Sequence, residues 1–143
     1  VKCFKIECAQ AASKLRKLVV EGGDVIEGPF DGEEGITLFA DLEAGATGNM
    51  SSAMIPDLIK PVVLDYLAGE FDKSEDKYNN ILPLINYENR QCGFRATKVI
   101  MKEGGVINSD FCRHPIPPLE EQTKAGLIKL VKKYDPIALS WGK

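Results

Sequence analysis

Short apolar runs alternate with stretches of helical spacing in the first half of the chain. Residues 2–6, 24–27 and 44–47 are short runs built around apolar or small side chains, each next to a polar residue. Their alternation with helical stretches predicts parallel βαβ units with right-handed crossovers. We therefore expect three parallel strands at these positions. The helices expected to follow them cover residues 8–21, 33–42 and 54–67.

The second half of the chain shows helical periodicity without a clear strand pattern. Apolar residues recur at i, i+3, i+4 and i+7 from Tyr78 onward, and further helices are predicted over residues 95–102 and 119–134. The composition changes where the two patterns meet. We therefore divide the chain into βα units over residues 1–68 and a helical region over residues 69–143.

Composition and charge narrow the class of protein. The 143 residues are 44% hydrophobic and 27% charged, which suits one folded domain, and the net charge of −3 argues against nucleic acid or an anionic membrane as a partner. With no long apolar run or signal-peptide pattern, a cytoplasmic protein with reduced thiols is expected. The four cysteines and single histidine match no zinc pattern, so no metal site is expected. Because the chain begins with Val1 in a core strand, we expect it to start inside a larger chain.

The first strand carries a lysine at its centre. An unpaired ammonium group on an apolar strand is costly, whereas a neutral, desolvated lysine amine attacks carbonyl carbon to form a Schiff base. The alternative is an edge lysine whose stem packs while its head reaches water. Glu7 lies two residues after Lys5, so both side chains point to the same side of the strand. Glu7 either moves protons for Lys5 or forms a simple ion pair with it.

Glu27 and Thr47 are expected at the ends of the second and third strands, level with Lys5. The carboxyl ends of parallel strands form the catalytic face of barrels, so these residues are candidates for the site. A surface charge is the alternative for Glu27. Gly28, Thr47 and Gly48 are candidates for substrate binding through hydroxyl and backbone N–H groups, although a tight turn also needs small residues.

Residues 29–32 are interpreted as a turn that leads into a helix. Asp31 followed by Glu34 at the third position resembles an N-cap and its partner. Glu33 and Glu34 are accordingly interpreted as carboxylates at a helix start, where the helix dipole favours negative charge. Neither is expected to be catalytic.

A strand with a central lysine, a strand ending in Glu-Gly, the sequence Gly-Ala-Thr-Gly at residues 45–48 and a helical tail follow one another. In this order they resemble the carboxy-terminal half of the dihydrodipicolinate synthase / N-acetylneuraminate lyase family. The resemblance covers essentially the whole chain. It implies an α/β fold, in which strands six to eight of a (β/α)8 TIM barrel precede a C-terminal helical extension.

The same resemblance implies a lyase. Members of the family are class I enzymes that form a Schiff base with 2-keto acids and need no metal or organic cofactor. Lys5 takes the place of their Schiff-base lysine, with Glu7 and Glu27 as further catalytic candidates. The synthase carries Gly-Asp-Asp after its seventh strand, where this chain has Gly-Pro-Phe-Asp at residues 28–31. The departure favours dehydration of a 2-keto-3-deoxy sugar acid by the full-length enzyme.

Alternatives remain open on function and partners. A retro-aldol lyase or the synthase would use the same lysine, and an inactive half-barrel would act only as an associating module. The family's carboxylate-binding Thr/Ser pair and catalytic tyrosine lie in strands that this sequence does not contain. We therefore expect a homo-oligomer or association with the missing barrel half, and a small 2-keto acid as the substrate.

Overall fold

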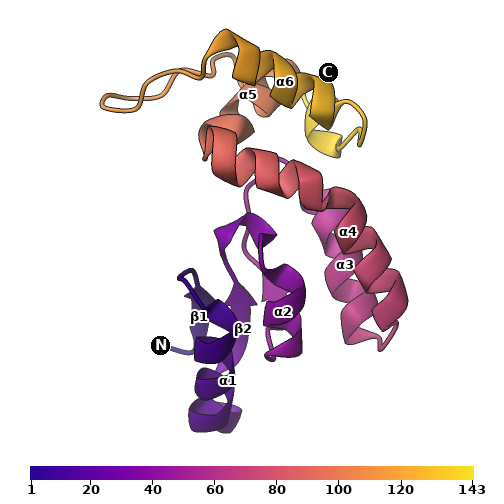
Figure 1. Cartoon of the computed structure of the whole chain (residues 1–143). Coiled ribbons are helices and arrows are strands. Elements are labelled where there is room, and N and C mark those ends of the chain that lie inside the picture. The colour runs from indigo at the N-terminus through magenta and orange to yellow at the C-terminus, as the bar shows by residue number, and fades with distance from the viewer. The chain divides into compact units, whose positions relative to one another are not determined.

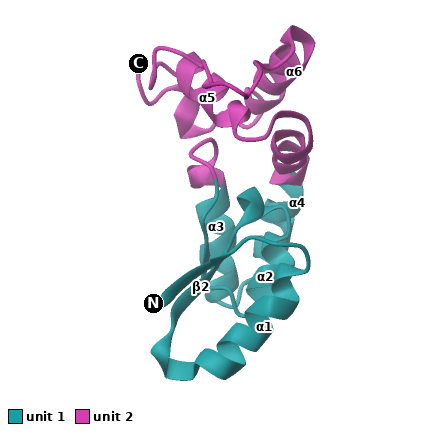
Figure 2. Cartoon of the chain, turned by 90° about the vertical axis from the view of Figure 1, so that its left-hand side faces the viewer, with its two compact units in different colours: residues 1–51, 59–80 teal, residues 52–58, 81–143 magenta.

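The computed structural model describes residues 1–143 and contains a small parallel sheet and several helices (Figure 1). Two compact units make up the chain: residues 1–51 with 59–80, and residues 52–58 with 81–143 (Figure 2). The expected boundary near Gly69 therefore falls within the first unit, and the division into two domains stays a prediction. None of the helices combines the length and apolar character that a membrane span requires.

The first unit contains the strands. In chain order it holds β1 (Cys3–Ile6), α1 (Ala11–Gly22), a 3₁₀ turn η1 (Gly23–Val25), β2 (Glu27–Asp31), a second 3₁₀ turn η2 (Glu33–Gly35), α2 (Leu38–Glu43), β3 (Gly48–Asn49), most of α3 (Pro56–Leu67) and the start of α4 (Phe71–Tyr87). The second unit holds the end of α4, the π-helical turn η3 (Glu88–Cys92), α5 (Arg95–Glu103), α6 (Glu121–Val131) and η4 (Ile137–Leu139).

The three strands form one parallel sheet in the order β1-β2-β3. Lys5 pairs with Phe30 and Phe30 pairs with Gly48, so these three residues lie level across the sheet. The parallel pairing and the helices between the strands confirm the predicted βαβ organisation. The arrangement is consistent with part of a (β/α)8 barrel.

The predicted position of the second strand is wrong. Glu27, expected to end the strand, begins β2, and the presumed turn at residues 29–32 is mostly strand. A Gly-Pro pair predicts a turn because proline cannot donate to the strand ladder. Here a register shift between Cys3 and Lys5 takes Pro29 out of the pairing with β1. The Pro29 carbonyl still accepts a hydrogen bond from the Thr47 amide at 2.8 Å.

The third strand also lies later than predicted. Residues 44–47 close helix α2 instead of forming a strand, and the Ala44 amide donates to the carbonyls of Ala40 and Asp41 at 3.1 Å. Gly45 then takes a left-handed φ of +99°, which favours glycine, and the chain turns into β3. Thr47 therefore precedes its strand.

Helices cover one face of the sheet. Along β1, Phe4 is half-buried and Ile6 is buried, whereas Cys3 and Lys5 between them are exposed. This period of two places Phe4 and Ile6 against the helices, and α1 and α2 both contact the sheet. The face that carries Lys5 is open. Buried side chains of the first unit include Leu15, Leu38, Leu42, Ile59, Val62 and Tyr78, and those of the second include Met54, Ile55, Leu84, Ile85, Ile100, Leu127 and Val131.

Candidate functional site

Lys5 lies on the open face of the sheet next to a carboxylate. Its Nζ is 2.5 Å from Oε2 of Glu7, and the two side chains are 36% and 49% exposed. The prediction that Lys5 and Glu7 point to the same side of the strand is therefore confirmed. Lys5 forms a solvent-exposed ion pair in this chain. The 143 residues do not bury the Lys5 amine among the apolar side chains that favour a neutral amine.

The turn after β2 brings a third charged group to this end of the sheet. Instead of a helix start, Glu33 and Glu34 have φ values of +46° and +55°, and Gly35 follows at +83°. A Cβ atom on Gly32 would lie only 2.7 Å from the Ile6 carbonyl oxygen. The turn is thus packed directly against the end of β1, and the interpretation of Glu33 and Glu34 as helix-start carboxylates is wrong.

Glu34 is within electrostatic reach of the Lys5–Glu7 pair. Burial raises the pKa of the Glu34 carboxyl, and the negative charges of Glu7 and Glu33 add to this effect, whereas the Lys5 ammonium group lowers it. A left-handed φ in a residue other than glycine costs free energy and is found preferentially at functional sites. Lys5, Glu7 and Glu34 together form the candidate site, which we call the lysine–carboxylate cluster.

Glu27 is not part of this cluster. It begins β2 opposite Cys3, and its Oε1 lies 3.4 Å from Nζ of Lys2. The Glu27 side chain is 66% exposed. The expected convergence of Glu27 with Lys5 at the strand ends is therefore wrong, because the strand starts at Glu27 and ends at Asp31.

The candidate substrate-binding residues surround an aromatic ring. A Cβ atom on Gly28 or on Gly48 would come within 2.9 Å of the Phe30 ring, so both glycines make room for it. Thr47 is exposed, and its hydroxyl donates to the Pro29 carbonyl at 3.4 Å. These contacts give the three residues structural roles. Their roles in substrate binding stay predictions.

Sequence reasoning missed Glu34 for an identifiable reason. The Asp-Gly-Glu-Glu sequence at residues 31–34 fits a helix cap as well as a strand end followed by a turn. A strand that continues through Gly28 and Pro29 would have placed Glu34 directly after its carboxyl end, where catalytic groups of parallel sheets gather. The signal was thus present but depended on the strand boundary.

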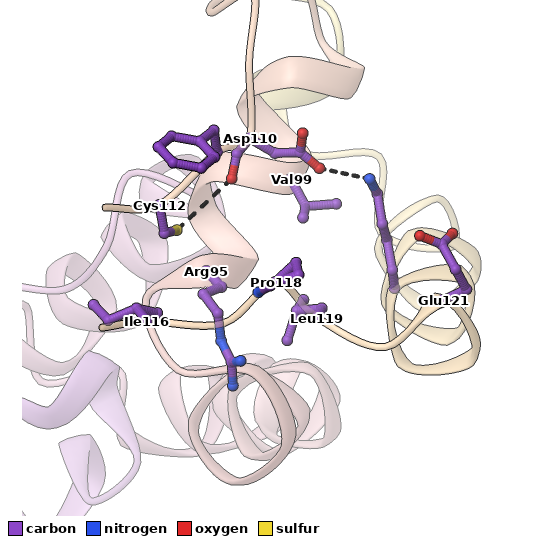
Figure 3. Close-up of a pocket in the computed structure, with 10 residues that line it drawn as sticks. Arg95, Val99, Asp110, Cys112, Ile116, Pro118, Leu119 and Glu121 are labelled. Atoms are coloured by element: carbon purple, nitrogen blue, oxygen red, sulfur yellow. Dashed lines mark hydrogen bonds and ion pairs between the residues drawn. The ribbon is translucent and has the colours of Figure 1, made fainter. Parts of the chain in front are cut away.

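A separate pocket of about 320 Å³ lies in the second unit, between α5, α6 and their connection (Figure 3). Val99, Cys112, Pro118 and Leu119 give it apolar walls, and the Asp110–Lys124 ion pair lies at one side. None of the residues predicted for the site lines it. Elsewhere, no three His, Cys, Asp or Glu side chains are placed so as to hold a metal ion.

Comparisons with known proteins agree with the fold. Residues 8–134 match the dihydrodipicolinate synthetase family. The L-2-keto-3-deoxyarabonate dehydratase of Azospirillum brasilense is 50% identical over 141 residues, which are 99% of this chain and 46% of that protein. The chain therefore spans about half the length of this relative.

Solved structures show the same fold. The dihydrodipicolinate synthase of Rhodopseudomonas palustris matches with a TM-score of 0.79 and 26% identity over 92% of this chain and 45% of that one. The dihydrodipicolinate synthase of Aquifex aeolicus matches with a TM-score of 0.82 and 19% identity over 95% and 46%. Since the family match covers most of the sequence, this chain belongs to the dihydrodipicolinate synthetase family.

Proposed function

We propose that Lys5 is the Schiff-base lysine of a lyase that dehydrates 2-keto-3-deoxy-L-arabonate to 2-oxoglutarate semialdehyde. The observation that carries the proposal is the lysine–carboxylate cluster at the carboxyl ends of parallel strands. The relative that is 50% identical and named for this substrate supports its choice. Because the chain spans 46% of that relative, the activity is proposed for a protein that supplies the remaining strands.

The first chemical step needs a neutral amine. Glu7, 2.5 Å from the Lys5 amine, is placed to accept its proton. The neutral amine attacks the C2 carbonyl carbon of the keto acid, and the resulting carbinolamine loses water to give an iminium ion. Further strands supplied by the full-length protein would cover this exposed face and exclude solvent from Lys5.

The iminium ion then drives dehydration. It withdraws electrons from C3, so that a base removes a C3 proton and leaves an enamine. The C4 hydroxyl departs as water, with Glu34 as the proton donor, because its raised pKa keeps more of the acid form present. Loss of protons from C5 and its hydroxyl, and return of protons to C3 and C4, make C5 an aldehyde. Water hydrolyses the imine and restores Lys5, and no metal or organic cofactor takes part.

Glu27 has no role in this scheme, because it pairs with Lys2 at the opposite end of its strand. The argument from the turn sequence also changes. Residues 28–31 are strand, and the turn after β2 is Gly-Glu-Glu at residues 32–34. The substrate is therefore proposed from the similarity to the dehydratase and from the acid–base pair. A homo-oligomer and a cytoplasmic location stay predictions.

Borohydride trapping tests the role of Lys5. In the full-length protein, sodium borohydride with pyruvate should reduce the imine and attach the keto acid to Lys5, as located by peptide mass spectrometry. Lys5→Ala should abolish trapping and lower turnover by at least about 1,000-fold, since no amine remains to form the intermediate. Lys5→Arg should not restore either property, because guanidinium stays protonated. Lys2→Ala is the matched control, and unchanged trapping in Lys5→Ala would contradict the proposal.

A second candidate is condensation by the same lysine, favoured by the structural similarity to the synthase of R. palustris at 26% identity. The products separate the candidates. Dehydration of 2-keto-3-deoxy-L-arabonate gives the semialdehyde with all five carbons retained, whereas retro-aldol cleavage releases pyruvate. Condensation of pyruvate with aspartate semialdehyde, and no dehydration, would establish synthase activity instead.

A further inference from the structure

Two carboxyl groups of the first unit, one at the end of β2 and one in α2, are fully buried. Asp31, the last residue of β2, is 1% exposed, and Asp41 of α2 is 0% exposed. Burying an ionised carboxylate is costly, and two neighbouring carboxylates do not both ionise readily. Neither residue takes part in the proposed reaction, so their burial requires a separate explanation.

Each carboxyl group has one oxygen with an identified donor. The Asn49 side-chain amide donates to Oδ2 of Asp31, and the Thr37 hydroxyl donates to Oδ2 of Asp41 at 2.9 Å. Oδ1 of each aspartate accepts no hydrogen bond from another group. A single proton between the two carboxyl groups would satisfy both residues and leave one negative charge in place of two.

The surrounding charges favour a proton at this place. Burial raises the pKa of Asp31 far above its ordinary value, the neighbouring Asp41 carboxyl raises it further, and the Asn49 amide opposes the shift. The charge of Glu33 also acts on Asp31. From α4, burial and the charges of Asp31 and Asp41 raise the pKa of Tyr78 to about 12, so that its hydroxyl remains a donor.

Hydrogen bonds fix the chain at both ends of the turn. The Asp31 carbonyl accepts a hydrogen bond from the Met50 amide at 2.9 Å, which fixes the residue before Gly32. At the far end, the Tyr78 hydroxyl donates to the Ile36 carbonyl at 2.7 Å. Between these two points the chain holds left-handed φ values at residues 33–35. Such a backbone persists only where its surroundings determine it.

We propose that Asp31 and Asp41 share one proton and act as positioning residues that hold the turn at residues 32–35 in place, with Glu34 beside Lys5. The positioning role rests on the proposed function, because it assumes that Glu34 transfers protons in that reaction. The shared proton itself does not depend on the reaction.

The shared proton makes stability depend on pH in a defined direction. An aspartate in the unfolded chain releases its proton above about pH 4, whereas folded Asp31 keeps it to much higher pH. This contribution is therefore fully present below about pH 4 and declines as the pH rises toward the folded pKa. Across that range, the folding equilibrium constant should fall about tenfold per pH unit for this one proton.

Asp31→Asn tests the shared proton. Asparagine keeps the shape and supplies a permanent N–H donor to Asp41, so denaturant unfolding of the full-length protein should lose this pH dependence between about pH 5 and 8. Relative to wild type, the variant should gain about tenfold in its folding equilibrium constant per pH unit. Asp76→Asn, an exposed change on α4, is the matched control. Identical pH slopes for wild type and Asp31→Asn would overturn the proposal.

Kinetics of the full-length enzyme test the positioning role. Asp31→Ala should lower turnover at least about tenfold while borohydride trapping at Lys5 stays within twofold, because only Glu34 is displaced. Asp31→Asn should recover most of the turnover. If Asp31→Ala does not fold, Asn49→Ala can be used, because it removes one hydrogen-bond donor to the pair. It should also lower turnover without lowering trapping at Lys5, but by a smaller factor. Turnover unchanged in Asp31→Ala and Asn49→Ala, or trapping lost together with turnover, would overturn the role.

The two hypotheses fail in distinguishable ways. Absence of trapping in the wild-type protein contradicts the proposed function, and the stability measurement with Asp31→Asn still decides whether the proton is shared. Normal trapping and dehydration, with turnover insensitive to the buried pair, contradicts only the positioning role.

Discussion

The carboxyl groups of Glu7 and Glu34 have different surroundings. Glu7 is in direct contact with the Lys5 ammonium group and is half exposed. Glu34 lies on a strained turn, and burial and neighbouring negative charge favour its protonated form. Two carboxyl groups whose environments differ in this way suit opposite tasks in proton transfer. This difference supports the proposed roles of Glu7 as proton acceptor and Glu34 as proton donor.

Glu34→Gln separates these roles in the full-length protein. The amide keeps the shape of the side chain but cannot donate a proton readily to the departing C4 hydroxyl. Turnover should fall by about 100-fold or more, in the range typical of general acid catalysis, while trapping at Lys5 persists. The measurements are steady-state dehydration and borohydride labelling. Glu33→Gln, one residue earlier on the turn, is the control, and equal losses in both variants would contradict the assignment to Glu34.

At the scale of elements, helices were easier to predict than strands. The helices expected at residues 54–67 and 95–102 are found as α3 and α5, with bounds within two residues. Long amphipathic periods define such helices even when their ends are uncertain. The strands have only two to five residues, and β2 contains a Gly-Pro pair that normally ends a strand. A register shift visible only in the sheet permits it.

Each residue of the candidate site could be predicted from the sequence only where the bounds of its strand were predicted correctly. Lys5 and Glu7 lie on β1, whose position was correct, and their pairing follows from the period of two. The interpretation of Glu34 and of the buried Asp31 depends on where β2 ends. Because the strand was predicted to end four residues too early, both were interpreted as helix-cap residues. Their left-handed turn and buried partners come from tertiary contacts that a local pattern does not contain.

The close approach of Gly32 to β1 gives a prediction for the turn. A side chain at this position would meet the Ile6 carbonyl oxygen and the Glu7 Cβ at 2.7 Å, and neither atom belongs to a flexible chain end. Gly32→Ala should therefore lower the free energy of unfolding by about 1–3 kcal/mol, the usual cost of overpacking. Turnover should fall with it because both Glu7 and Glu34 flank the contact. If denaturant unfolding gives Gly32→Ala the same free energy of unfolding as wild type, the turn can move away from β1 at no cost in stability.

An ion-pair clamp in the second unit gives another prediction. Asp110 lies in the connection between α5 and α6, and its carboxylate oxygens contact Nζ of Lys102 at 2.7 Å and Nζ of Lys124 at 2.5 Å. Hydrogen bonds from both lysines lower the pKa of Asp110 well below its ordinary value. The clamp is therefore fully formed above about pH 4 and weakens as the pH falls through the folded pKa.

Asp110→Asn should loosen this connection at neutral pH. We expect a loss of about 1 kcal/mol, since the pairs are partly exposed, with faster amide hydrogen exchange across residues 105–120. The difference from wild type should shrink as the pH is lowered below about 4, where the unfolded aspartate is protonated. Asp76→Asn serves as the control. Equal exchange rates at pH 7 in wild type and variant would show that the lysines do not hold this segment.

For the whole molecule, the sheet explains why the site needs further protein. β1 and β3 each pair only with β2, so each leaves one edge with free backbone groups. The face that carries Lys5 and Phe30 is open, and Met50, which follows β3, is 41% exposed. Free strand edges and open apolar faces promote association of chains. In relatives about twice as long, the additional residues are available to cover these surfaces.

The isolated 143-residue chain should therefore associate and lack turnover. Sedimentation should show dimers or larger species, because the edges of β1 and β3 and the open face find partners in other copies. Dehydration of 2-keto-3-deoxy-L-arabonate should be negligible, since Lys5 is exposed to solvent and no further strands orient the keto acid. Correct orientation alone is worth roughly 7–11 kcal/mol of a barrier. A stable monomer with full activity would show that the lysine–carboxylate cluster suffices without the remaining strands.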